Sequence, residues 1–121
     1  MNSFLAQISP TDTNINVALD NPQGLSIEVN SILICNTTAV ATTFDIYSDK
    51  TNIDSKTYDE SNAIFFEATI EANQTIHVNG DNLIILDDAS CSIAVKVGTA
   101  SAITFSFFGE TTQTTTSTTT A

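Results

Sequence analysis

The sequence predicts an all-β fold, an antiparallel β-sandwich of jelly-roll type built from about eight or nine short strands. Apolar and polar residues alternate at a period of two along most of the chain, and no segment shows a convincing helical stripe. Thr, Val and Ile are abundant, and their branched side chains favour strands. Short turn-forming stretches divide the chain into runs of strand length. With 121 residues, the chain fits one domain with an ordinary core.

The clearest expected strand is the run of residues 64–71. One face carries Ile, Phe, Ala and Ile, and the other carries Phe, Glu, Thr and Glu, which is the pattern of a half-buried strand. Phe105 lies on the apolar face of another alternating run and is expected in the core. Two continuous apolar runs predict strands that are covered on both faces. The other alternating runs are residues 44–47, 93–97 and 103–107, and the continuous ones are 32–35 and 83–86.

Turn chemistry gives one specific prediction. Asn79-Gly80 lies between the alternating triplet 76–78 and Leu83. Both turn residues tolerate positive φ, and turns of this type match the twist of the flanking strands. We therefore expect a hairpin at Asn79-Gly80.

The chain divides into three regions. Residues 1–20 mix apolar residues with Ser, Thr and Asn, and form either an N-terminal arm or an edge strand. Residues 21–110 form the sandwich. Residues 111–121 contain eight threonines and no apolar face, so they cannot build structure on their own. Because threonine suits an added β-strand, this tail is predicted to dock on another protein chain.

The charge balance excludes several classes of partner. Three Lys, no Arg and fourteen acidic residues give a net charge of −11. This charge repels phosphate backbones and anionic membranes, so neither nucleic acid nor a membrane is expected as a partner. The sequence contains no apolar run long enough for a transmembrane helix, and its beginning lacks the features of a secretory signal, so we expect use without export.

The residues offer no catalytic constellation, and we expect neither an enzyme nor a cofactor. The single histidine, His77, alternates with apolar neighbours and is expected to be an exposed strand residue. No glycine-rich phosphate loop occurs. Cys35 and Cys91 lie in apolar, β-branched runs, which favours free thiols, while a disulfide between two strands remains the alternative.

One polar stretch could bind a metal ion. Its oxygen-bearing side chains are of the kind that Ca²⁺ prefers, but the EF-hand spacing and the turn glycine are missing, and Lys50 and Lys56 would partly neutralise the site. A solvated acidic loop is the favoured interpretation, with a calcium site as the alternative. The candidate ligands are Asp45, Asp49, Asn52, Asp54 and Asp59.

Several runs taken together resemble small β-sandwich virion proteins of tailed bacteriophages. The resemblance spans roughly residues 25–110, and the chain departs from it at residues 49–51, where related sequences often have a glycine. Such proteins decorate capsids as cement proteins or sit on tails. The resemblance therefore implies a structural role without catalytic residues. The runs that carry it are residues 34–38, 43–47, 58–66, 70–75 and 84–90.

Two functions follow as expectations. The first is a capsid decoration (cement) protein on the outer surface of the virion, bound to the major capsid protein or another virion protein and forming a homo-oligomer. The alternative is a tail-associated or receptor-binding adhesin, for which Tyr47 and Tyr58 are the aromatic candidates for stacking on a sugar. The partner-binding candidates for the first function are Phe4, Leu5, Ile8, Thr111, Thr112, Thr114, Thr115 and Thr116.

Overall fold

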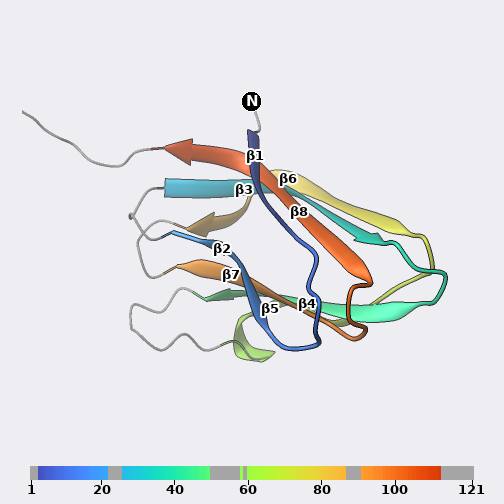
Figure 1. The fold of residues 1–121 in the computed structure, drawn as a ribbon. Coiled ribbons are helices and arrows are strands. Elements are labelled where there is room, and N and C mark those ends of the chain that lie inside the picture. The colour runs from blue at the N-terminus through green and yellow to red at the C-terminus, as the bar shows by residue number, and fades with distance from the viewer. Residues whose placement is uncertain (1–2, 22–25, 50–57, 59, 87–90, 113–121) are drawn as a thin grey trace, which may run out of the picture.

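The computed structural model describes residues 3–21, 26–49, 58, 60–86 and 91–112, and folds them into two four-stranded sheets packed face to face (Figure 1). The prediction of an all-β sandwich is confirmed. Between the fourth and fifth strands lies one short 3₁₀ turn, η1 (Glu60–Asn62). The strands are β1 (Ser3–Ile8), β2 (Asn16–Asp20), β3 (Ser26–Asn36), β4 (Thr42–Asp49), β5 (Ala63–Ile70), β6 (Thr75–Leu86), β7 (Ser92–Val97) and β8 (Ile103–Thr112).

The strand order is that of a jelly roll. One sheet has the order β1-β8-β3-β6 and the other β2-β7-β4-β5, with antiparallel pairing throughout. Except at β4 and β5, consecutive strands alternate between the sheets, which is how two Greek keys interleave in this fold. The described part of the chain contains no helix that is long and apolar enough to cross a membrane.

The core lies between the two sheets and is formed by every second residue of their central strands. Phe105 is fully buried, as its place in the alternation predicted. Its ring meets that of Phe44 from the opposite sheet edge-on, with centroids 6.1 Å apart and planes at 68°. This contact joins the two sheets at their centre. The other fully buried large side chains are Val29, Ile32, Ile34, Ile46, Ile70, Leu86, Ile93, Val95, Ile103 and Phe107.

The first and the last described strands are integral parts of the sandwich. β1 and β2 are edge strands of the two sheets, which corresponds to the edge-strand alternative for residues 1–20 rather than to an arm. At the other end, β8 continues past the expected boundary at residue 110, because Thr111 and Thr112 pair with Ile27 and Ser26 of β3.

The hairpin prediction at Asn79-Gly80 is wrong. Both halves of β6 run along β3 in the same direction: Val78 pairs with Ile32, and after the irregularity Ile84 pairs with Val29. β6 has residues 80–83 where β3 has only Asn30, so these residues form an enlarged bulge. The local preference of Asn79-Gly80 for a turn was overridden by strand pairing, because the long strand β3 offers hydrogen-bonding partners to both halves of β6.

Every edge strand of the described sandwich is irregular. The register shifts in β1 between Phe4 and Ala6, in β2 between Val17 and Leu19, twice along β5, and at the enlarged bulge of β6. Bulges on edge strands interrupt the regular row of backbone groups that another strand would need for pairing. The sandwich is therefore a poor acceptor for a strand from another chain.

Candidate functional site

Pairing between β1 and β8 brings together the two segments that were predicted separately to contact a partner, the one around Phe4 and the one that begins at Thr111. The strands are antiparallel, with Ser3 opposite Gly109 and Phe4 opposite Phe108. The start of β1 therefore lies beside the end of β8, at one end of the same sheet (Figure 1). Thr111 and Thr112, both exposed, extend β8 from this place.

An exposed aromatic pair marks this end of the sheet. Phe4 is 59 % exposed, and its ring packs edge-on against that of Phe108, with centroids 5.8 Å apart and planes at 72°. Phe107 points into the core, so the adjacent Phe108 points to the outer face of the sheet. Phe4 and Phe108 together leave adjacent apolar surface at this end of the sheet, which makes it a candidate contact site.

Two glutamates lie next to the aromatic pair. Val29 is fully buried, so Glu28 points to the outer face, and Glu110 stands directly opposite it on β8. Glu110 is two residues along the strand from Phe108 and shares its face. We call the set Phe4, Phe108, Glu28 and Glu110 the terminal patch. Phe108 was not predicted from the sequence, although the doubled Phe107-Phe108 could have indicated an outward ring, because adjacent strand residues cannot both face the core.

The other predicted contact residues differ in accessibility. Leu5 and Ile8 are partly buried and pack against the core, so Phe4 is the residue of the three that presents an exposed ring. Thr114, Thr115 and Thr116 lie outside the described residues.

Hydrogen bonds between side chains join β1 to β8 farther along this outer face. Gln7 Nε2 donates to Ser106 Oγ at 2.9 Å, and the hydroxyls of Ser9 and Thr104 are 2.7 Å apart. These contacts join β1, and the residue just after it, to β8. They hold the edge strand that carries Phe4 in a fixed place.

His77 is exposed, as predicted, but it has a partner that the sequence did not indicate. Its Nε2 lies 2.8 Å from Ser31 Oγ. A serine beside a histidine is the start of a nucleophile and base arrangement, but catalysis also needs a group that orients the imidazole. In this structure the bond satisfies the hydroxyl of Ser31, which is only 8 % exposed, and that is the role we assign to it.

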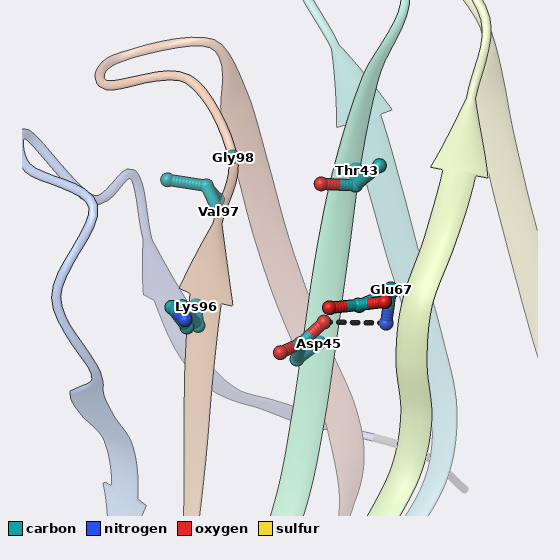
Figure 2. A pocket seen from close by; sticks show the side chains of 6 residues that line it. All are labelled: Thr43, Asp45, Glu67, Lys96, Val97 and Gly98. Atoms are coloured by element: carbon teal, nitrogen blue, oxygen red, sulfur yellow. Dashed lines mark hydrogen bonds between the residues drawn. The ribbon is translucent and has the colours of Figure 1, made fainter.

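The opposite sheet carries a small polar pocket on its outer face (Figure 2). The pocket holds about 80 Å³, well below the roughly 300 Å³ at which small-molecule sites begin. Asp45 is its central group and is only 6 % exposed. Lys96 stands opposite it on β7. The residues that line the pocket are Thr43, Asp45, Glu67, Lys96, Val97 and Gly98.

The carboxylate of Asp45 accepts two hydrogen bonds from neighbouring residues of the same sheet. Its Oδ1 accepts the backbone N–H of Glu67, and its Oδ2 accepts the hydroxyl of Tyr47, each at 2.6 Å. Phe44 pairs with Ala68 and Ile46 with Phe65, so two residues of β5 lie opposite Asp45. One of them, Glu67, has a φ of 51°. Asp45 thus satisfies an amide that the β-bulge removes from the regular ladder.

These contacts bear on the calcium hypothesis. Both oxygens of Asp45 already accept hydrogen bonds, so this residue stabilises the β-bulge at Glu67 in the structure. The backbone of Asp49 pairs with Ser92, while its side chain and the residues Asn52, Asp54 and Asp59 lie outside what the structure describes. Among the described residues, no group of three or more His, Cys, Asp or Glu side chains could hold a metal ion.

The two tyrosines considered for sugar stacking pack on each other. Tyr47 is 3 % exposed, and its ring centroid lies 6.1 Å from that of Tyr58. The hydroxyl of Tyr58 is 2.6 Å from Ser92 Oγ. Because Tyr47 is buried, only the half-buried Tyr58 has surface left for a ligand.

Both cysteines are free, with Cys91 buried and Cys35 partly buried, which agrees with the prediction of free thiols. No protein-family model, curated protein or solved structure matches the chain. The resemblance to phage virion proteins therefore stays a prediction.

Proposed function

We propose that this protein is a non-enzymatic structural protein of a virion, a capsid decoration (cement) protein that attaches to the major capsid protein or another virion protein through its terminal patch and C-terminal segment. The observation that carries the proposal is the exposed Phe4 ring, packed on Phe108 where Thr111 and Thr112 end the last strand. One attachment point thus combines an apolar anchor with the end of the last described strand.

The fold and the charge agree with this role. Jelly rolls occur among viral capsid proteins, although they also serve other functions, so the fold supports the proposal only by analogy. A net charge of −11 keeps copies soluble when they are displayed at high density on a particle surface.

Attachment would use two kinds of contact. The Phe4 ring enters an apolar pocket of the partner, as aromatic anchors do in protein interfaces. The threonine-rich segment adds to a sheet edge of the partner as an extended strand. The chain acts as the strand donor in this scheme, because bulges interrupt its own edge strands.

The copy number of the protein in purified particles tests the proposal. We expect hundreds of copies in the head fraction when heads and tails are separated and quantified by mass spectrometry. A count of a few to a few dozen in the tail fraction would favour the adhesin instead. In that case Tyr58→Ala should reduce binding to host cells or carbohydrate. Absence of the protein from purified particles would contradict both functions.

A further inference from the structure

We infer that β5 can pair with β4 in a second register, in which Ile64 and Phe66 move from the surface into the core. The inference goes beyond the proposed function and does not depend on it. It is drawn from the two bulges that interrupt the pairing of these strands, and from the alternation of apolar and polar residues along β5.

The observed pairing of β5 with β4 is regular at one end only. The last three residues of β5 pair with the first three of β4 without interruption. Farther along, Phe65 lies opposite Ile46, so two residues of β5 face the single residue Asp45. A second shift near the start of β5 adds another unpaired residue there. As a result, the eight residues of β5 cover only residues 42–47 of the eight-residue strand β4.

Extending the regular end of this ladder gives a second register without bulges. Both strands have eight residues, so continuous pairing would place every residue of β5 opposite one of β4. Phe66 would then lie opposite Ile46, and Ile64 opposite Ser48. Ile46 is fully buried, and Ser48 shares its face, because β4 pairs with β7 without interruption along this stretch. Ile64 and Phe66 would therefore both point into the core.

The alternation of the sequence fits the second register better than the observed one. One face of the run 64–71 carries only apolar residues, and continuous pairing would bury that whole face. In the observed register Phe65 packs on Phe44 in the core instead, with ring centroids 5.3 Å apart. Ile64 and Phe66 are left 44 % and 43 % exposed. The two registers thus place one or the other of two adjacent phenylalanine rings in the same part of the core.

One contact favours the observed register, and two features oppose it. The carboxylate of Asp45 accepts the backbone N–H of Glu67 at the bulge (Figure 2). Glu67, however, has a φ of 51°, in the left-handed region that is unfavourable for a residue with a branched or long side chain. The observed register also leaves Ile64 and Phe66 in contact with water. Because these contributions oppose one another, we expect the two registers to lie close in free energy.

The register determines what the edge of this sheet presents to another chain. β5 is an edge strand. Its bulges interrupt the row of backbone groups in the observed register, whereas continuous pairing would leave an eight-residue edge without interruption. A regular edge is the form to which another strand can add. The bulged register therefore protects the edge, and the second register opens it.

Substitutions at the two adjacent phenylalanines test the inference in the isolated full-length protein. Phe65→Ser places a polar side chain in the core of the observed register, but on the surface of the second register. We expect this variant to fold with Phe66 in the core, which cross-strand NOEs between Ile46 and Phe66 would show. Phe66→Ser should keep the wild-type NOEs between Ile46 and Phe65. A Phe65→Ser variant that does not fold, or that keeps residue 65 opposite Ile46, would overturn the inference.

Urea unfolding of the same variants gives a second readout. Each single variant keeps one ring that can occupy the core, whereas the double variant Phe65→Ser/Phe66→Ser keeps neither. The midpoint of the double variant should therefore fall by more than the sum of the two single shifts. Shifts that add up would mean that only Phe65 enters the core, which contradicts the inference.

Two substitutions at Glu67 act on the bulge while removing the same charge. Glycine tolerates a φ of 51°, so Glu67→Gly should keep the observed register. Valine is unfavourable at positive φ and suits a regular strand, so Glu67→Val should move the NOEs of Ile46 from Phe65 to Phe66. The same register in both variants would speak against the inference. So would a Glu67→Val protein that fails to fold, because the second register does not need a left-handed backbone at this residue.

Discussion

Gly109 occupies a position on β8 where no side chain fits. A Cβ atom there would overlap the backbone carbonyl oxygen of Glu28 on the neighbouring strand β3. The overlap arises next to the register shift between β3 and β8, where the backbones approach closely. Glycine is therefore required at this position by space.

The first prediction concerns this contact. Gly109→Ala should lower the free energy of unfolding by on the order of 1–3 kcal/mol, because the backbone of β3 must move to admit the methyl group. Urea unfolding measures the effect. Gly80→Ala is the matched control, since the added Cβ would lie 3.1 Å from the movable end of the Leu83 side chain. Equal midpoints for Gly109→Ala and the wild type would show that the strands are not in such close contact.

A second prediction concerns Asp45. Asp45→Ala removes the acceptor of the part-buried Glu67 amide bond and of the buried Tyr47 hydroxyl bond, and an unsatisfied buried group costs about 1–3 kcal/mol. The variant should be clearly destabilised in urea. Asp45→Asn should lose less, because its side-chain oxygen can still accept the amide. If the two variants unfold at the same midpoint, the bond to the amide does not support the bulge.

At this scale the sequence predicted burial at Phe105 but not along β5, where Ile64 and Phe66, both on the apolar face expected for residues 64–71, are 44 % and 43 % exposed. The alternation around Phe105 was sufficient to place it in the core. The roles of Asp45 and Ser31 depend on partners 22 and 46 residues away in the chain. Neither partner can be known before the strands are paired, so the calcium hypothesis could not take into account that the bulge occupies Asp45.

At the scale of elements, local turn preference was overridden where a long strand was available for pairing. Asn79-Gly80 was expected to reverse the chain, but β3 pairs with β6 on both sides of it. The strand-forming character of both flanking runs was predicted correctly. The direction of the chain between them depends on β3 and could not be read locally.

The connection between β1 and β2 gives a third prediction. The backbone N–H of Asn14 donates to Asp12 Oδ1 at 3.0 Å, and Asn16 Nδ2 donates to the same oxygen at 3.2 Å. The Asn14 bond first, then the Asn16 bond, lowers the pKa of Asp12 below its ordinary value of 3.8. A lowered pKa in the folded state contributes stability above the unfolded-state pKa, and this contribution disappears as the pH falls through the folded-state value. Amide exchange at Asn14 should therefore accelerate, relative to the intrinsic rate, in that acid range, and Asp12→Asn should remove the dependence. A pH-independent protection factor would contradict it.

The C-terminal segment gives a fourth prediction at the scale of elements. Removal of residues 113–121 should leave the melting temperature of the domain unchanged, because β8 ends at Thr112 and the removed residues add nothing to the described core. The same truncation should weaken attachment to the partner. A longer truncation, from residue 111, also removes the pairs of Thr111 and Thr112 with β3 and should cost some stability. A large fall in melting temperature for the shorter truncation would show that the segment belongs to the fold.

For the whole molecule, the class of fold followed from alternation, but the order of strands did not. The jelly roll depends on pairs such as Phe4 with Phe108, which join the two ends of the chain. A period of two indicates which residues share a face, without indicating which strand lies beside which. The terminal patch is a product of that order, so the sequence supplied Phe4 but neither Phe108 nor its two glutamates.

The net charge makes salt act in opposite directions on folding and on attachment. Repulsion among the acidic groups of a chain with a net charge of −11 destabilises its compact state, and salt screens this repulsion. Raising the NaCl concentration should therefore raise the melting temperature of the isolated protein, by about 4 °C for each kcal/mol of repulsion removed. If the partner surface is basic, the same salt should weaken attachment, because it also screens the attraction between that surface and the acidic chain. Differential scanning fluorimetry and binding at matched salt concentrations measure the two effects. KCl is the control and should act like NaCl, since screening depends on ionic strength. If Ca²⁺ raises the melting temperature more than NaCl does at the same ionic strength, and EDTA reverses the effect, a metal site in the acidic stretch is supported instead. Attachment that is insensitive to salt would show that apolar and backbone contacts alone hold the protein to its partner.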